Sequence, residues 1–257
     1  MSAQYGINLL AAIPGRSENN DRSEMVTQLL FGECYEVLEE REKWMRVRCL
    51  HDQYECWIDR GQHHPCSKET CEAARSGRIL LDTFNYIQAE DESLIPLSAG
   101  AILPVSQQGS GIQIENRSFG VLQGLTTGPI DPKELPTYSL RLLNTPYLWG
   151  GRSTFGIDCS GFTQLLMRAI GVSIPRDASQ QIEAGQAVQT LAESNPGDLA
   201  FFANDKNIVT HVGMLLRPDR IIHASSRVKV EVINNEGIVH ETERNITHRL
   251  CGIRRYF

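Results

Sequence analysis

The sequence lacks several features that would assign it to a broad class at once. It has no excess of basic residues, since 25 lysines and arginines stand against 31 aspartates and glutamates and give a formal charge of -6. We therefore expect no nucleic-acid partner, because such proteins concentrate positive charge. No apolar run approaches the length that crosses a membrane, and no basic stretch followed by an apolar core opens the chain. We expect a cytoplasmic protein.

Patterns of paired cysteines are also missing. The seven cysteines are an odd number without a Cys-x-x-Cys pair, namely Cys34, Cys49, Cys56, Cys66, Cys71, Cys159 and Cys251. Such usage fits a reducing compartment better than a disulfide framework. His63 and His64 precede Cys66 and Cys71, but this spacing matches no zinc pattern and favours a solvated linker. We expect no metal and no cofactor.

The N-terminal part has the pattern of a small β domain. Short stretches with partly alternating hydrophobicity predict strands at Met25–Leu30, Glu36–Leu38, Lys43–Arg48 and Glu55–Ile58. Strands at intervals of about ten residues are typical of a small all-β barrel or sandwich. The apolar run from Ile7 to Ile13 predicts the first strand of this domain.

A second region with a similar pattern of short predicted strands follows, but it has fewer characteristic aromatic residues. Strands are expected at Ala101–Val105, Ile112–Glu115 and Ser118–Leu122, and the stretch Thr127–Pro132 has the glycine and prolines of a linker. A chain of 257 residues has room for two or three domains with their own cores. The predicted domains are residues 1–74, 75–130 and 131–257.

The third region contains a candidate nucleophile, Cys159. Apolar residues at helical spacing follow it, namely Phe162, Leu165, Leu166, Ala169 and Ile170. Asp158 suits an N-cap and Gly171 suits the position just past the helix end, so Cys159 lies in the first turn. The helix dipole favours an anion there, which predicts a thiol prepared to ionise. The pattern indicates a cysteine nucleophile.

Two histidines provide the partners of such a nucleophile. The apolar stretches Ile208–Leu216 and Arg220–Ala224 flank a turn and predict an antiparallel hairpin. His211 and His223 share one face of this hairpin if its loop holds an odd number of residues. A thiol nucleophile needs an imidazole to take and return its proton, and that imidazole needs a third group to fix its tautomer. Cys159, His211 and His223 can fill these three roles.

Each of these residues also has a structural interpretation. A buried cysteine is usually a small hydrophobe, and a histidine in a strand is usually structural. The helix start and the hairpin together favour catalysis over three unrelated structural residues.

Five motifs follow one another along this region: Tyr147-Leu-Trp-Gly-Gly151, Asp158-Cys-Ser-Gly-Phe162, Ile174-Pro-Arg-Asp177, Pro196-Gly-Asp-Leu199 and the paired histidines. In this order they resemble the NlpC/P60 cysteine peptidases, over roughly residues 135 to 257. The resemblance implies a papain-like α+β domain, in which a helix-borne cysteine packs against an antiparallel sheet that carries the histidines. Family members mostly cleave bacterial cell-wall peptides, typically between D-glutamate and a diamino acid.

The N-terminal strands are similar to the bacterial SH3-like domain that often precedes an NlpC/P60 domain. The expected fold is therefore a papain-like catalytic domain after all-β SH3-like barrels, with residues 75–130 as a second such unit. Proteins of this arrangement resemble dipeptidyl-peptidases that require a free N-terminal L-alanine and release L-Ala-D-Glu. A cytoplasmic enzyme of this kind would meet imported murein peptides, which implies a role in recycling.

The resemblance also implies substrate contacts. Asp158 matches the residue that pairs with the substrate ammonium, and blocking that amine would leave a buried carboxylate without a partner. Glu24 resembles a second acidic contact, although a surface glutamate is usually only solvated. Tyr54 and Trp57 are possible walls of the same pocket.

At the reacting carbonyl, the Cys159 backbone N–H would meet the oxyanion, with the Tyr147 hydroxyl as second donor or else a core aromatic. Ser160 would contact substrate or satisfy the helix start. Three alternatives stay open: an amidase or endopeptidase on longer wall fragments, an acyltransferase, and a non-catalytic SH3-like peptide-binding protein. Neither the oligomeric state nor the preference for diaminopimelate or lysine follows from the sequence.

Overall fold

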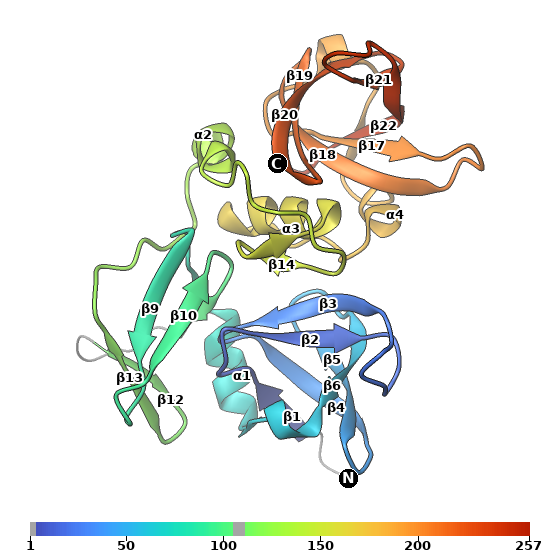
Figure 1. The fold of residues 1–257 in the computed structure, drawn as a ribbon. Helices are drawn as coiled ribbons and strands as arrows, with labels where there is room; N and C mark the ends of the chain where they lie inside the picture. Colours follow the sequence, from blue (N-terminus) through green and yellow to red (C-terminus); the bar gives the residue numbers. More distant parts are fainter. Residues whose placement is uncertain (1–3, 105–110) are drawn as a thin grey trace. The chain divides into compact units, whose positions relative to one another are not determined.

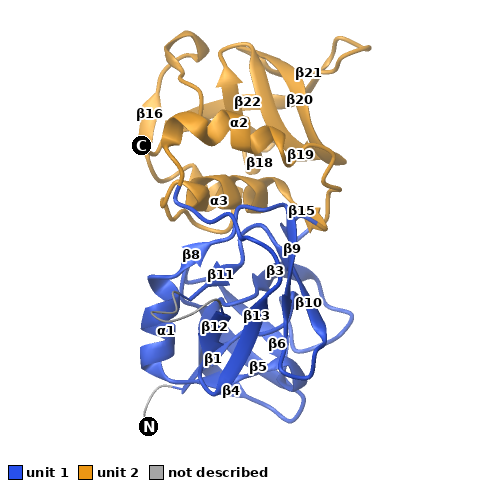
Figure 2. Cartoon of the chain, turned by 90° about the vertical axis from the view of Figure 1, so that its left-hand side faces the viewer, with its two compact units in different colours: residues 1–129, 149–154 blue, residues 130–148, 155–257 orange. Residues whose placement is uncertain are grey.

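The computed structural model describes residues 4–104 and 111–257, and the chain folds into two compact units (Figure 2). The first unit consists of residues 1–129 together with 149–154, and the second of residues 130–148 together with 155–257. The segment 149–154 therefore folds with the N-terminal half of the chain, although it lies inside the predicted third domain. Each unit is described by itself.

The main sheet of the first unit is antiparallel, in the order β3-β2-β6-β5-β4-β1-β7 (Figure 1). Its strands are β1 (Gln4–Ile7), β2 (Ala12–Arg16), β3 (Met25–Leu30), β4 (Cys34–Glu40), β5 (Trp44–Cys49), β6 (Glu55–Asp59) and β7 (Pro65–Cys66). Alternate side chains such as Ile13, Leu29, Val47 and Ile58 form the core under this sheet. The four strands predicted between residues 24 and 62 are confirmed.

The single strand predicted from Ile7 to Ile13 is wrong. The buried Asn8 side chain donates to the Leu29 carbonyl at 2.7 Å and to the Leu10 carbonyl at 3.0 Å, and accepts from the Leu10 N–H at 2.8 Å. These bonds replace the partners that a strand would offer, so the chain bends between β1 and β2.

The rest of the first unit is built from short elements. They are the 3-10 turn η1 (Arg60–Gln62), α1 (Lys68–Arg75), β8 (Arg78–Ile79), β9 (Phe84–Gln88), β10 (Leu94–Ser98), β11 (Ile102–Leu103), β12 (Gly111–Ile114), β13 (Arg117–Val121) and β14 (Arg152–Ser153). One sheet has the order β10-β9-β13-β12, and β11 pairs with β8. The strands predicted in this region correspond to β11, β12 and β13, with Val105 outside the described residues, whereas β8, β9 and β10 were not predicted.

The two predicted N-terminal domains share a core. Ile7 and Phe31, from before the expected boundary at residue 74, pack in one cluster with Leu80 and Ile87, from after it. The boundary itself falls in the last turn of α1. The division into 1–74 and 75–130 stays a proposal about sequence modules, since both contribute to one compact unit.

The second unit combines helices with a curved antiparallel sheet. Its elements are η2 (Pro132–Glu134), α2 (Leu135–Leu140), β15 (Gly156–Ile157), α3 (Cys159–Ala169), α4 (Ala178–Gln181), β16 (Gln186–Val188), η3 (Leu191–Glu193), β17 (Leu199–Ala203), β18 (Val209–Arg217), β19 (Arg220–Ser225), β20 (Arg227–Asn234), β21 (Gly237–Val239) and β22 (Ile246–Arg255). The order is β16-β22-β17-β18-β19-β20-β21, and β21 also pairs with β22, so the sheet closes on itself. Helix α3 packs against β18 and β19. The expected α+β fold is confirmed.

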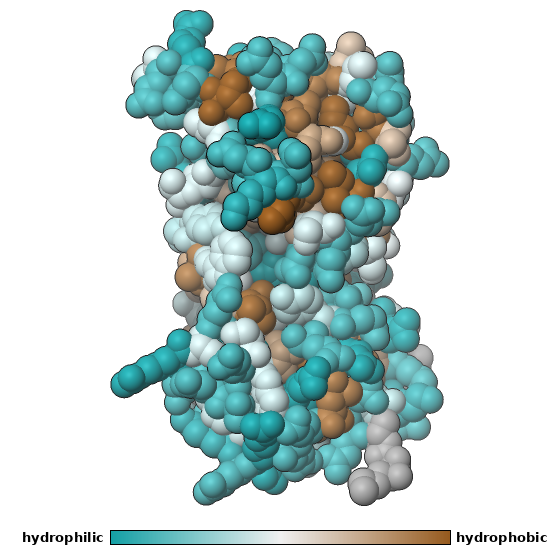
Figure 3. All heavy atoms as spheres, turned by 90° about the vertical axis from the view of Figure 1, so that its right-hand side faces the viewer, coloured by the Kyte–Doolittle hydropathy of each residue, from teal (hydrophilic) through white to brown (hydrophobic). Residues whose placement is uncertain are grey.

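Most large apolar side chains belong to the interior. Phe31, Tyr35, Phe162, Phe201 and Phe202 are among the largest fully buried residues. On the face shown in Figure 3 the surface is largely hydrophilic, with apolar atoms in smaller groups. Among the residues that the structure describes, no helix has the length and apolar character needed to span a membrane.

Candidate active site

Helix α3 holds Cys159 at its first position. The Asp158 carboxylate caps the helix by accepting a hydrogen bond from the Gly161 N–H at 2.7 Å, and Gly171 ends it with a φ of 79°. The predicted helix and both of its ends are thus confirmed. Nearly every residue of α3 is buried, and Cys159 itself is only 5% exposed.

The Cys159 thiol is not acidic, contrary to the expectation from its helix position. Burial, and then the charge of Asp158, raises the pKa of the thiol to about 12. The backbone N–H of Val212 and the charge of Arg176 lower the pKa, but they do not compensate. The cost of desolvating a thiolate exceeds the stabilisation from the helix end, so the free protein holds a protonated thiol that needs a base.

The candidate base lies on the hairpin of β18 and β19. His211 Nε2 lies 2.7 Å from His223 Nδ1, which confirms that the two histidines share a face. The turn between the two strands has an even number of residues, which alone would place the histidines on opposite faces. A register shift between Leu215 and Arg217 adds one residue to β18 and brings them to the same face. Val212, whose backbone N–H lowers the pKa of the Cys159 thiol, directly follows His211 in β18. The structure therefore brings Cys159, His211 and His223 into one region of the second unit.

Both imidazoles are neutral near pH 7. Burial, and then the neighbouring His223 and His248, holds the pKa of His211 well below its ordinary value of 6.5. Burial also lowers the pKa of His223, against the opposing effect of Glu231. The resting site is thus a neutral thiol beside a neutral imidazole, which is a form that can transfer a proton from sulfur to nitrogen.

Glu231 continues this site and was missed by the sequence reasoning. Its Oε2 lies 2.7 Å from His223 Nε2 and 2.9 Å from Lys229 Nζ. The hydrogen bond from His223, aided by Lys229 and opposed by burial, lowers the pKa of Glu231 to about 2. The alternation of β20 places Lys229 and Glu231 on one face, and recognising β20 as the partner of β19 was the signal that could have found them.

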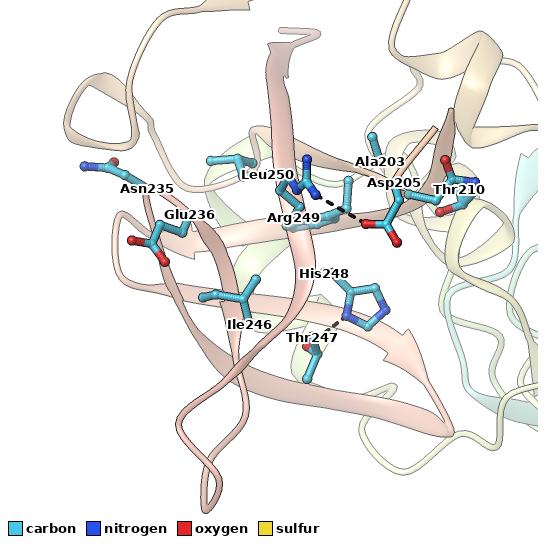
Figure 4. A pocket seen from close by; sticks show the side chains of 12 residues that line it. Ala203, Asp205, Thr210, Asn235, Glu236, Ile246, Thr247, His248, Arg249 and Leu250 are labelled. Atoms are coloured by element: carbon cyan, nitrogen blue, oxygen red, sulfur yellow. Dashed lines mark hydrogen bonds and ion pairs between the residues drawn. The ribbon is translucent and has the colours of Figure 1, made fainter. Parts of the chain in front are cut away.

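His248 is a second residue that the sequence reasoning missed. Its ring stacks on the His211 ring, with centroids 4.2 Å apart and planes at 32°. It also lines a pocket of about 790 Å³, where Arg249 pairs with Asp205 at 3.3 Å (Figure 4). Burial, and then His223, lowers the pKa of His248 to about 4. Neither Cys159 nor His211 lines this pocket, which borders the site through His248 and through Phe202, whose ring centre lies 5.7 Å from that of His211.

Asp158 already has a cationic partner, which corrects the sequence-based view of this residue. Arg176, 1% exposed, donates from Nη1 to Asp158 Oδ1 at 3.0 Å and from Nη2 to Oδ2 at 2.5 Å. Arg176 Nη1 also donates to the Ser160 hydroxyl at 2.8 Å, and this hydroxyl lies 3.3 Å from Asp158 Oδ1. The carboxylate is therefore not left uncompensated when a substrate amine is blocked. The sequence showed Arg176 only as part of a motif, because nothing local indicates its partner.

Tyr147 lies beside the start of α3. Its backbone N–H donates a hydrogen bond to the carbonyl of Ser226 at 2.9 Å. This bond links the segment that contains Tyr147 to the residue that follows β19. Burial, and then the charges of Cys159 and Asp158, raises the pKa of its hydroxyl. The hydroxyl therefore stays protonated and able to donate a hydrogen bond.

The remaining predicted contacts belong to the first unit. The exposed Glu24 accepts a hydrogen bond from Trp149 Nε1 at 2.5 Å. The Arg41 guanidinium lies 4.7 Å from the centre of the Trp57 ring, and Tyr54 is partly buried. Contact of Glu24, Tyr54 or Trp57 with substrate stays a prediction.

A possible metal position also lies in the first unit. The sulfur atoms of Cys34, Cys66 and Cys71 are all within 4.8 Å of one another. A structural zinc site takes four ligands, and no further histidine, cysteine or carboxylate among the described residues joins this group. The sequence-based expectation of no metal stays a prediction.

Comparison with known proteins places this geometry in a family. Residues 144–247 match the model of the NlpC/P60 family, and residues 15–62 match that of the bacterial dipeptidyl-peptidase SH3 domain. A gamma-D-glutamyl-L-lysine dipeptidyl-peptidase of Bacillus subtilis is 31% identical over 248 residues, which cover 90% of this chain and 81% of that protein. The chain belongs to the NlpC/P60 family.

Other relatives agree with this assignment. Dipeptidyl-peptidase 6 of Lysinibacillus sphaericus is 25% identical to this NlpC/P60 chain, over 81% of the chain and 83% of the relative. The crystal structure of an NlpC/P60 family protein from Bacillus cereus has the same fold, with a TM-score of 0.83 at 20% identity over 98% of this chain and 99% of that one. The chain is thus an NlpC/P60 peptidase with an SH3 domain before its catalytic domain.

Proposed function

We propose that this NlpC/P60 peptidase hydrolyses the γ-D-glutamyl–diamino acid bond of short murein peptides with a free N-terminal L-alanine. It would release L-Ala-D-Glu and act in cell-wall peptide recycling in the cytoplasm. The observation that carries the proposal is the buried Cys159 at the start of a helix that packs against the two strands carrying a hydrogen-bonded His211–His223 pair. The relatives from Bacillus subtilis and Bacillus cereus are gamma-D-glutamyl-L-lysine dipeptidyl-peptidases, which supports the same bond class.

The reaction starts with a proton transfer inside the site. His211 takes the thiol proton of Cys159, and the thiolate attacks the γ-carbonyl carbon of D-glutamate. The resulting imidazolium gives its proton to the nitrogen of the diamino acid as the C–N bond breaks, which leaves a thioester on Cys159. Water then attacks the thioester while His211 takes its proton, and that proton returns to sulfur as the carboxylic acid leaves.

Two donors would meet the negative charge on the tetrahedral oxygen. The Cys159 backbone N–H is one of the free donors at the start of α3, and the protonated Tyr147 hydroxyl lies close to the same residue. Donors fixed in advance stabilise this charge without reorganising during the reaction. In this proposal His223 acts only by holding the His211 ring.

Recognition of the substrate amine would involve Asp158 and Ser160. The ion pair with Arg176 reduces the negative charge that Asp158 offers to an ammonium. The pair also holds the carboxylate in one orientation, which favours a directed hydrogen bond over a general attraction. We therefore expect a moderate preference for the free amine, about tenfold, below the range of two to five kcal/mol typical of a buried charge left without any partner.

A product analysis tests the proposal. L-Ala-γ-D-Glu-L-Lys should be cut at the γ-glutamyl bond to L-Ala-D-Glu and lysine, and the N-acetylated peptide should be cut more slowly. Equal rates on both would overturn the amine requirement and favour the second candidate, an endopeptidase or amidase on longer wall fragments. The Asp158–Arg176 pair is the observation that favours this candidate, because it leaves Asp158 without a strict need for a substrate cation.

The non-catalytic alternative is tested in the same assay. A peptide-binding protein would bind both peptides without releasing product. Product formation that is lost in Cys159→Ala would exclude it.

A further inference from the structure

A chain of hydrogen bonds connects the interior of the second unit to its surface. His211 Nε2 lies 2.7 Å from His223 Nδ1, and His223 Nε2 lies 2.7 Å from Glu231 Oε2. The same oxygen lies 2.9 Å from Lys229 Nζ. The exposed side-chain fraction rises from 0% at His223 to 10% at Glu231 and 26% at Lys229. A solvent-facing cation is thus linked, through a carboxylate, to the proposed base.

The ionised Glu231 carboxylate determines where the hydrogen atoms lie along this chain of hydrogen bonds. An ionised carboxylate only accepts hydrogen bonds, so His223 Nε2 must carry a hydrogen. A neutral imidazole has a single N–H, and His223 Nδ1 must therefore accept from His211 Nε2. This leaves His211 Nδ1 without a hydrogen. Nδ1 is then the only nitrogen of the pair that can take a proton from outside it.

We propose that Glu231 is a positioning residue for the reaction, which holds His223, and through it His211, in the tautomer whose Nδ1 is the base. The inference rests on the proposed roles of Cys159 and His211. Without an acceptor at position 231, His223 can carry its hydrogen on Nδ1. His211 would then accept at Nε2 and carry its own hydrogen on Nδ1, where it could not receive the thiol proton.

Lys229 supports this arrangement from the outer side. It shares Oε2 with His223, so it fixes which carboxylate oxygen faces the imidazole and keeps Glu231 ionised. A simple surface ion pair within β20 would not require a carboxylate that also reaches a fully buried histidine. The position of Glu231 between a cation and His223 is what distinguishes a relay from a surface pair.

The charged groups around the two imidazoles shift the pKa of His223 in opposite directions, which gives a measurable test. The groups that face them are Lys229 and Glu231 from β20 and His248 from β22, with Cys159 at the start of α3. Glu231 raises the pKa of His223, whereas Lys229 lowers it. Removing the carboxylate and removing the ammonium should therefore move the protonation of the pair in opposite directions.

The first experiment needs no substrate. In the full chain with ¹⁵N-labelled histidines, two-bond ¹H–¹⁵N spectra report which ring nitrogens carry hydrogen. We expect Nε2–H and a bare Nδ1 on both His211 and His223. Glu231→Gln should keep this pattern, because the amide oxygen can still accept with Lys229 beside it, and Glu231→Met should lose it. His223→Ala and His211→Ala assign the signals.

The second experiment measures kcat and the acidic limb of kcat/KM. Glu231→Gln should lower kcat about tenfold and Glu231→Met about a hundredfold, the range for losing a hydrogen bond to a charged group. The acidic limb should move to lower pH in Glu231→Gln and to higher pH in Lys229→Met. Glu241→Gln removes the same charge from an exposed position and serves as the control, with an unchanged profile.

Two results would overturn the proposal. One is a hydrogen on His211 Nδ1 in the unmutated protein at neutral pH. The other is a folded Glu231→Met variant with unchanged kcat and unchanged ring-nitrogen signals. If no peptide is cut by any variant, the proposed function fails, while the ring-nitrogen spectra still decide the role of Glu231.

Discussion

Buried cysteines occur in both units, and their surroundings differ in what they can do. In the first unit, hydrogen bonds from Cys34 and Cys66 lower the pKa of Cys71, and no histidine belongs to this group of described residues. In the second unit, burial raises the pKa of Cys159, and the strands β18 and β19, against which its helix packs, carry an imidazole pair. The more acidic thiol is thus not the one with a base. We therefore expect catalytic competence to depend on the partner of the thiol more than on its own acidity.

The largest expected effect is the loss of peptide cleavage when the Cys159 thiol or its proposed base is removed. Cys159→Ala and His211→Ala should each reduce peptide cleavage below detection, because neither attack nor proton transfer survives alone. The double variant should be no worse than either single one, since the two residues act as a unit. His223→Ala should retain a trace of turnover. The measurement is product release from L-Ala-γ-D-Glu-L-Lys.

The matched control for this prediction is Cys71→Ala, which removes the thiol of lowered pKa from the first unit. It should cost stability through the lost packing, while kcat per folded molecule stays unchanged. Normal turnover in His211→Ala, or complete loss in a folded Cys71→Ala, would contradict the comparison between the two units.

A buried arginine–carboxylate pair occurs among the described residues of each unit. Arg152 donates to Glu33 at 2.7 Å in the first unit, and Arg176 donates to Asp158 in the second. Arg152→Met and Arg176→Met should each lower the free energy of unfolding of their unit by about 3–5 kcal/mol, because each leaves a buried charge unpaired. Denaturant unfolding followed by a probe in each unit measures this loss.

The two pairs should differ in their effect on catalysis. Arg176→Met should also lower kcat/KM, since Asp158 caps the helix that carries Cys159, and Arg152→Met has no such link within its unit. Recovery of the free energy of unfolding in the double variant Asp158→Asn/Arg176→Met would confirm that the unpaired charge causes the loss of stability. A stable, fully active Arg176→Met would refute it.

The acidity of Cys159 gives a smaller effect. Because the pKa of its thiol is raised to about 12, alkylation by iodoacetamide at pH 6 should be slower than that of an ordinary thiol with a pKa of about 8.5. Peptide mass spectrometry identifies the modified cysteine, and Cys159→Ser provides the background. Selective, rapid labelling of Cys159 at pH 6 would instead indicate a preformed thiolate and a different resting state.

The pH dependence of stability should be the smallest effect. The pKa values of His211, His223 and His248 are lowered in the folded state, so below about pH 6.5 the unfolded chain binds protons that the folded chain does not. Stability should fall as the pH drops through this range, by up to about 1.4 kcal/mol per pH unit for each histidine. His248→Gln should flatten the slope measured by urea unfolding at pH 5 to 7, and an unchanged slope would contradict the assignment.

Local signals made much of the site predictable. Asp158 and Gly171 mark the two ends of α3 because capping depends on neighbouring residues. The hairpin of β18 and β19 was predictable as well, whereas the face that His211 and His223 share depends on the register shift between Leu215 and Arg217. Sequence reasoning failed where a partner comes from far along the chain. Arg176 reaches Asp158 from a loop 18 residues away, and neither residue reveals this locally.

Other failures have related physical causes. The run from Ile7 to Ile13 looked like a strand because the effect of a buried Asn8 on distant carbonyls does not appear in an alternation pattern. The position of Cys159 at a helix start could be predicted from the sequence, but the burial of its side chain could not. Desolvation of the thiol is the largest effect on its pKa and raises it. His248 lies on β22, which β17 separates from β18 in the sheet order, so its contact with His211 could not be read from the sequence.

The account is tested most directly by trapping the covalent intermediate. Acid quenching of the full chain during turnover of L-Ala-γ-D-Glu-L-Lys, followed by peptide mass spectrometry, should reveal an L-Ala-γ-D-Glu acyl group on Cys159. The adduct should be absent in Cys159→Ala and should fail to form in His211→Ala. Release of L-Ala-D-Glu without any adduct, together with continued turnover by Cys159→Ala, would contradict the central claim that Cys159 is the nucleophile of this peptidase.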